Sequence, residues 1–92
     1  MSSRVWTWDV GDKAKGFIDK LDRPIGDRLL RYIWDDLASL ENPRSKGKSL
    51  KGSKFGDIWC YRRGDYRILT SICDERVFVL VVDAGHRKEI YR

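Results

Sequence analysis

The stretch Tyr61-Arg62-Arg63-Gly64-Asp65-Tyr66-Arg67 decides the fold. Strand-prone, aromatic residues precede its Gly-Asp pair, and an alternating apolar and polar run follows it. A Gly-Asp pair between two such runs is typical of a two-residue turn, so we expect a β-hairpin. In that register Arg63 pairs with Tyr66, and Arg62 lies directly opposite Arg67. Because facing guanidinium groups repel each other, this pair indicates either a nearby carboxylate or a site that receives an anion.

The remaining strands are predicted around this hairpin. We expect strands over residues 58–63, 66–73 and 76–84, with Asp74-Glu75 as a second tight turn, and a short opening strand over residues 5–8. The run 77–82 is apolar on both faces, which is typical of a central strand. Residues 44–54 are basic and rich in Gly and Ser, so we expect a loop there.

Two helices are predicted between the opening strand and this loop. Asp9 is expected to cap the first helix, and Asp22 with Pro24 to begin the second, which ends at Asn42-Pro43. Apolar residues follow at helical spacing: Val10, Ala14, Phe17, Ile18 and Leu21, then Ile25, Leu29, Ile33, Leu37 and Leu40. The sequence therefore predicts one α+β domain over residues 1–92, with an N-terminal strand and a two-helix hairpin packed on one face of a mainly antiparallel four-stranded sheet.

Charge is distributed unevenly along the chain. The net charge is +5, and residues 1–43 contribute −1 (seven Lys/Arg and eight Asp/Glu), whereas residues 44–92 contribute +6 (twelve and six). A positive field in one half suggests a polyanionic partner there, although a solvated basic surface has the same composition.

The cysteines and the apolar runs indicate the compartment. In the predicted register Cys60 faces Leu69, so Cys73 is too far along its strand to form a disulfide with it. Two unpaired thiols fit a reducing cytosol, and the sequence has no CxxC motif or His/Cys cluster for a metal. No apolar run approaches transmembrane length, so we expect a cytoplasmic protein with no membrane segment, metal or cofactor.

Strand alternation places Arg62 and Arg67 on the sheet face that the helices leave open. The closing segment brings Arg87, Lys88 and Tyr91 back from the end of the central strand, after His86, which is the one histidine of the chain. Arginine, tyrosine and histidine suit RNA cleavage by internal transesterification, because arginines stabilise phosphoryl charge and Tyr or His can move protons. Individually, Arg67 could be a surface ion-pair residue, Tyr91 a packing residue and His86 a turn residue. The basic loop could be a solvated connector or a phosphate-binding arm.

Four segments, in order along the chain, resemble the RelE-type toxins of bacterial and archaeal toxin–antitoxin pairs: residues 42–44, 50–52, 61–68 and 85–91. This resemblance implies a metal-independent, ribosome-dependent endoribonuclease that cuts mRNA in the ribosomal A site of the 30S subunit, and a cognate antitoxin that inhibits it as a hetero-oligomer. The free toxin would be monomeric. The resemblance implies that Arg67 stabilises the transition state, that Arg87 protonates or stabilises the leaving group, and that Tyr91 acts on the 2′-hydroxyl. Lys51 and Arg62 correspond to basic positions that hold RNA.

The chain departs from that family at Cys60, where related toxins often have Lys or Arg. Phosphate contacts could then shift to the loop lysines Lys48, Lys51 and Lys54, with Lys88 as a further cation. The role of His86 stays open, since some members have Lys at that position. Two other functions remain: a ParE-type toxin, which shares the fold but binds DNA gyrase, and an RNA-binding protein without activity.

Overall fold

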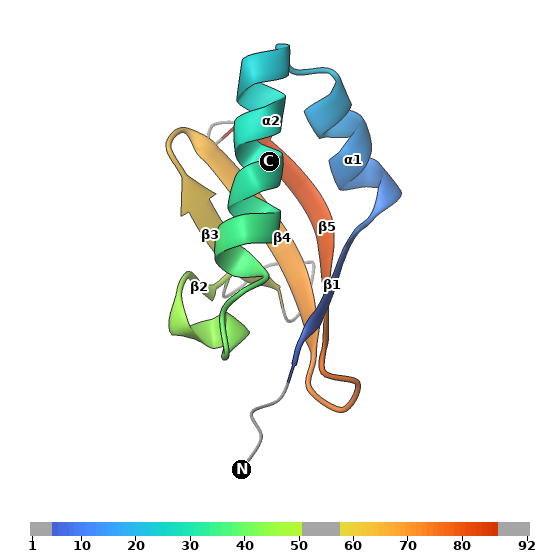
Figure 1. Ribbon diagram of the computed structural model, residues 1–92, viewed down its shortest axis with the longest axis vertical. Helices are drawn as coiled ribbons and strands as arrows, with labels where there is room; N and C mark the ends of the chain where they lie inside the picture. The colour runs from blue at the N-terminus through green and yellow to red at the C-terminus, as the bar shows by residue number, and fades with distance from the viewer. Residues whose placement is uncertain (1–4, 51–57, 87–92) are drawn as a thin grey trace.

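The computed structural model describes residues 5–50 and 58–86 (Figure 1). An N-terminal strand leads into two helices, and further strands follow after a short helical turn. In chain order these are β1 (Thr7–Val10), α1 (Asp12–Asp19), α2 (Arg23–Arg31), a π-helical segment (Tyr32–Leu37), a 3-10 turn (Pro43–Ser45), β2 (Lys48–Ser49), β3 (Trp59–Arg63), β4 (Tyr66–Cys73) and β5 (Phe78–His86).

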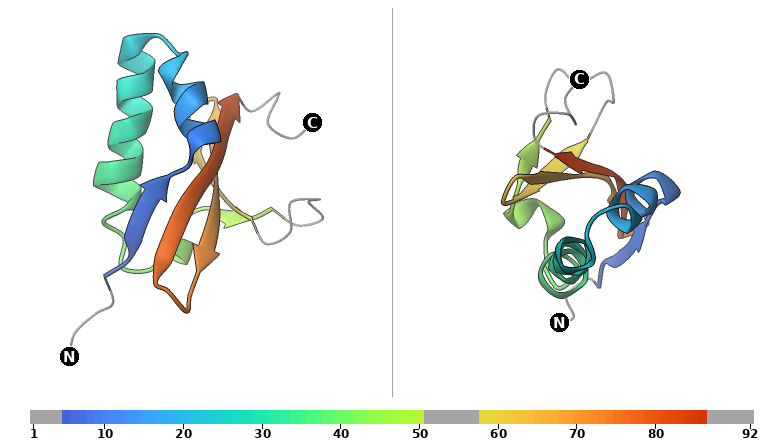
Figure 2. Two further views of the ribbon diagram at one scale, coloured as in Figure 1. Left: turned by 90° about the vertical axis from the view of Figure 1, so that its right-hand side faces the viewer. Right: turned by 90° about the horizontal axis from the view of Figure 1, so that it is seen from above.

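The strands form one sheet with both helices on one of its faces (Figure 2). The order is β1-β5-β4-β3-β2, in which β1 runs parallel to β5 and the other neighbours are antiparallel. The α+β class is confirmed. The described sheet has five strands rather than the expected four, because part of the predicted loop forms the short edge strand β2.

The helical spacing of apolar residues correctly predicts which side chains are buried, but it predicts the ends of the helices less well. The predicted apolar positions Ala14, Ile18, Leu29, Ile33 and Leu37 are all buried. Asp9 was expected to cap α1, but it lies in β1, where its Oδ1 accepts a hydrogen bond from the Val10 amide at 2.8 Å. The second helix is not regular as far as Leu40, since it becomes π-helical after Arg31. Neither helix in the described part of the chain is long and apolar enough to cross a bilayer.

The turn between β4 and β5 is longer than expected. It spans residues 74–77, so β5 begins at Phe78 rather than at Arg76 and continues to His86. Val77 has φ +50°, a left-handed conformation that costs a β-branched residue energy. The expected two-residue turn is therefore wrong by two residues, and the chain ends the turn in a strained conformation.

A β-bulge in β5 reverses which side chains face the helices. Leu69 pairs with Asp83 but Thr70 pairs with Val81, so Val82 is the extra residue. Side chains alternate along a strand, and one inserted residue shifts this alternation. Before the bulge Val79 and Val81 are in the helix-facing core, and after it Ala84 is.

Two apolar clusters stabilise the sheet. The larger one lies between the helices and the sheet and includes Tyr61 and Ile68. A smaller one joins Ile58, Cys60 and Leu69, with Leu50 and Val82 packed against it. Because Cys60 pairs with Leu69 and neither belongs to the larger cluster, the smaller cluster lies on the opposite face, which we call the open face.

Candidate phosphate-binding site

The β3–β4 hairpin has the register that the sequence predicts. Arg62 pairs with Arg67, Arg63 with Tyr66 and Cys60 with Leu69. Since paired residues share a face, Arg62 and Arg67 lie with Cys60 on the open face. A pocket of about 240 Å³ is lined there by Gly47, Lys48, Cys60, Arg62 and Arg67. The Nη1 atom of Arg67 is buried, whereas Arg62 is exposed.

Lys48 reaches this pocket because it lies in the edge strand β2, where it pairs with Cys60. Three cationic side chains from β2, β3 and β4 therefore line one small pocket. Lysine contributes a compact charge, and arginine contributes a planar pair of donors that matches two phosphoryl oxygens. Such a set is suited to bind a phosphate group or a carboxylate.

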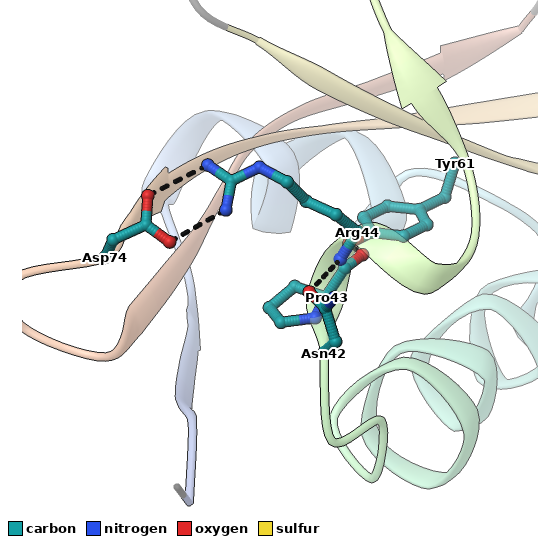
Figure 3. A network of polar contacts seen from close by, with 5 residues as sticks. All are labelled: Asn42, Pro43, Arg44, Tyr61 and Asp74. Carbon is teal, nitrogen blue, oxygen red and sulfur yellow. Dashed lines mark hydrogen bonds and ion pairs between the residues drawn. The ribbon is translucent and has the colours of Figure 1, made fainter.

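The segment Asn42–Ser49 contains the 3-10 turn and β2, and contacts of Pro43 and Arg44 hold it against the rest of the fold (Figure 3). The Tyr61 hydroxyl donates a hydrogen bond to the Pro43 carbonyl. Arg44 donates two hydrogen bonds to Asp74, at 2.8 and 3.0 Å, and its backbone amide donates to the Asn42 side chain at 2.9 Å. We call Asn42–Ser49 the strap.

The strap approaches β3 closely at Gly47. Trp59 Nε1 donates to the Lys46 carbonyl at 2.7 Å, and the Arg44 guanidinium lies 6.0 Å from the Trp59 ring centroid. Gly47 has φ +78°, and a Cβ there would lie 2.5 Å from the Cys60 carbonyl oxygen and 2.9 Å from Trp59 Nε1. Only glycine permits this backbone conformation at this distance, so Gly47 determines where Lys48 lies.

Two tyrosines beneath the site are held protonated. Burial raises the pKa of the Tyr61 hydroxyl well above its ordinary value. Burial also raises the pKa of Tyr32, although the nearby Arg63 guanidinium opposes that shift. The Arg63 guanidinium lies 5.4 Å from the Tyr32 ring centroid. Both hydroxyls are hydrogen-bond donors to backbone carbonyls, so these tyrosines are structural residues rather than bases.

His86 does not join the arginines. It pairs with Tyr66, and the two rings meet edge to face at a centroid distance of 5.7 Å. Tyr66 in turn packs against Phe17 of α1, so His86 faces the helices. The bulge in β5 causes this placement, because it shifts the alternation by one residue before His86 is reached. The structure thus places His86 on the helix side, away from Arg67, and its catalytic role stays a prediction.

Several predicted site residues lie outside the described residues: Lys51, Lys54, Arg87, Lys88 and Tyr91. Of the others, Lys48, Arg62 and Arg67 come together in the pocket. The sequence analysis missed the residues that hold Lys48 in place, namely Trp59 and Gly47. The available signal was a glycine between two lysines, followed twelve residues later by a tryptophan.

Cys60 has a different role from the one its position suggests. It is 3% exposed and packs in the open-face cluster with Ile58 and Leu69. Neither Cys60 nor Cys73 forms a disulfide. Cys60 therefore contributes an apolar surface to the pocket, which Lys48, Arg62 and Arg67 also line.

A second pocket, of about 490 Å³, lies on the helix side of the hairpin tip. Its lining combines apolar side chains from α2 and the hairpin with charged ones: Ile25, Arg28, Leu29, Arg63, Gly64, Asp65 and Tyr66. Its charges are mixed, so it is less suited to a polyanion than the open-face pocket. Over residues 5–50 and 58–86, no group of three or more His, Cys, Asp or Glu side chains is arranged to hold a metal ion.

Comparison with known proteins places this architecture among bacterial and archaeal toxins. Residues 10–91 match the family model described as the ParE toxin of the type II toxin–antitoxin system parDE. Toxin RelG of Mycobacterium tuberculosis is 33% identical over 79 residues, which cover 86% of this chain and 87% of that protein.

Solved structures show the same fold. The toxin–antitoxin complex RelBE2 from Mycobacterium tuberculosis contains a chain with a TM-score of 0.78 and 27% identity, and the match covers 91% of this chain and 93% of that one. A chain of the archaeal RelE–RelB complex from Pyrococcus horikoshii has a TM-score of 0.68 and 20% identity, over 94% and 99% of the two chains.

Proposed function

The chain belongs to the RelE/ParE superfamily of toxins from type II toxin–antitoxin systems, and from this premise we propose that it is an mRNA interferase. In this proposal the toxin enters the ribosomal A site and cuts mRNA there by attack of a 2′-hydroxyl on the adjacent phosphate. Translation stops as a result. The relative at 33% identity is a toxin named RelG, which supports the RelE-type branch.

The open-face pocket is the observation that carries this proposal. Lys48, Arg62 and Arg67 line it together, and Arg62 and Arg67 are directly opposed across β3 and β4. Opposed like charges destabilise a sheet, and a phosphate bound between the two guanidinium groups would relieve this repulsion. A phosphate in transesterification gains negative charge in the transition state, and fixed cations at that point stabilise it.

The proposed roles follow from the geometry and from the family resemblance. Arg67, with one guanidinium nitrogen buried, is preorganised to stabilise the pentacovalent phosphate. Arg62 and Lys48 would hold the neighbouring phosphates. Arg87 and Tyr91 are proposed to act on the leaving 5′-oxygen and on the 2′-hydroxyl, as the resemblance implies. Because His86 faces the helices, the proposal no longer includes it among the catalytic residues.

We further propose an antitoxin as the physiological partner and the cytoplasm as the site of action. Two solved relatives are complexes of a toxin with its antitoxin. An acidic antitoxin segment over the open face would neutralise the three cations and exclude RNA.

The alternative function is gyrase binding, since the matching family model is described as a ParE toxin. The two functions need different surfaces. The interferase requires the open-face cations for chemistry, whereas a gyrase-binding toxin has no need of a phosphate pocket.

The deciding experiment adds purified protein to programmed ribosomes and maps the mRNA 5′-ends by primer extension. We expect cleavage within the A-site codon, loss of cleavage in Arg67→Ala, and retained cleavage in Arg63→Ala, the control on the opposite face. A DNA supercoiling assay with gyrase runs in parallel. Intact mRNA together with inhibited supercoiling would overturn the interferase proposal in favour of the ParE-type function.

A further inference from the structure

We propose that Trp59 and Gly47 are positioning residues for RNA binding: they hold the strap against β3 so that the Lys48 ammonium stands beside Arg62 and Arg67. This inference rests on the proposed function in one respect, because it takes the open-face pocket to be a site for RNA phosphates. Neither positioning residue carries a charge. Their proposed contribution to phosphate binding is therefore to hold Lys48 in place.

Specific contacts, and not only the pairing of the strands, determine the position of Lys48. β2 is only two residues long, so its pairing with β3 alone gives Lys48 few fixed contacts. The 2.7 Å bond from Trp59 Nε1 to the Lys46 carbonyl fixes the backbone two residues before Lys48. Gly47 lets that backbone lie against the Cys60 carbonyl, where a Cβ would come within 2.5 Å.

The Trp59 ring is itself held in place from outside the pocket. The Arg44 guanidinium lies over the ring and is fixed by its bidentate bond to Asp74 at the β4–β5 turn. Asp74 pairs with the Arg44 charge, so this anchor reaches the pocket through the contacts of the Trp59 ring with the strap.

The consequence for binding is measurable because salt dependence counts phosphate contacts. Each contact to single-stranded RNA contributes about 0.7 to the slope of log affinity against log salt. Lys48→Met should lower the slope by about 0.7. Trp59→Phe, which removes the indole N–H donor together with part of the ring, should lower it by the same amount.

The test measures binding of a fluorescent single-stranded RNA oligonucleotide across a salt series, with no ribosome present. Between 50 and 200 mM salt, loss of one contact makes the fall in affinity about 2.6-fold smaller. The double variant Trp59→Phe/Lys48→Met should match Lys48→Met alone. Lys48→Arg should keep the wild-type slope, since it keeps the charge.

A second pair of variants distinguishes loss of Lys48 placement from misfolding. Gly47→Ala should reproduce the smaller slope, while Gly16→Ala, at a helical glycine with no atom within 4 Å of the new Cβ, should leave it unchanged. Circular dichroism checks that each variant is folded.

Three results would overturn the inference: an unchanged slope in both Trp59→Phe and Gly47→Ala, additive losses in the double variant, or no RNA binding by the wild type. Failure of the proposed function appears differently. In that case ribosome-bound mRNA stays intact while the slope changes persist.

Discussion

Replacing Arg62 with glutamine should stabilise the isolated protein while weakening its hold on RNA. Arg62 is exposed and stands opposite Arg67 in the β3–β4 ladder. Removing one of two opposed like charges should raise the free energy of unfolding by about 0.5 kcal/mol at low salt. For a domain of this size, that corresponds to an increase in Tm of about 2–4 °C.

The assay is thermal unfolding followed by circular dichroism at low and at high salt. Near 1 M salt the screening length is about 3 Å, so the gain should disappear. Arg63→Gln is the matched control, because the adjacent guanidinium contacts the Tyr32 ring on the opposite face. Loss of that cation–π contact should lower the stability by about 0.5–1 kcal/mol, which is the opposite sign.

Thermal unfolding in the presence of heparin tests whether the arginine pair binds a polyanion. At a hundredfold excess over its Kd, a polyanion that binds only the folded state stabilises it by about 2.7 kcal/mol. The wild type should show this shift and Arg62→Gln a smaller one. A lower Tm for Arg62→Gln at low salt, or a gain in Tm that persists at high salt, would refute the reasoning that repulsion between the two arginines destabilises the protein until an anion binds.

Three further perturbations test the surroundings of the site. Because burial raises the pKa of Tyr61 and Tyr32, the unfolded chain loses these protons at lower pH than the folded protein does. The free energy of unfolding should therefore fall as pH rises above about 10. Urea titrations at successive pH values measure this fall, which should be smaller in Tyr61→Phe. Val77→Asn should raise Tm by about 4–8 °C, since asparagine tolerates a positive φ, for a gain of about 1 kcal/mol; a lower Tm would show that burial of Val77 outweighs the strain. Cys60→Lys should cost about 1–3 kcal/mol in chemical denaturation because residue 60 is buried, whereas Cys60→Ala should be milder; equal stability of the lysine variant and the wild type would refute this.

Local chemistry was enough to predict the hairpin. The Gly-Asp turn fixes which residues of β3 and β4 oppose each other, so the pairing of Arg62 with Arg67 and their shared face could be derived from the sequence. The helix-facing core was predictable for the same reason, since its members recur at regular spacing. Features that follow from the regular spacing of residues along a helix or strand can be predicted from a single sequence.

The bulge and the strap were not accessible in this way. An inserted residue in β5 has no sequence signal of its own, because Val79 to Val82 are all apolar, yet it determines that His86 faces the helices. The strap depends on contacts between residues thirteen and thirty positions apart, Lys46 with Trp59 and Arg44 with Asp74. These contacts require the sheet to exist first, so composition alone indicated a loop.

The two faces of the hairpin divide stability from binding. Arg63 faces the helix side and packs on an aromatic ring, while its neighbour Arg62 faces a like charge on the open face. The larger apolar cluster and the protonated tyrosines stabilise the helix side, so the open face can carry cations that cost stability. If the proposed acidic partner covers the open face and binds only the folded protein, it would remove this cost. Inhibition and stabilisation of the toxin by such a partner would then be two results of the same contacts.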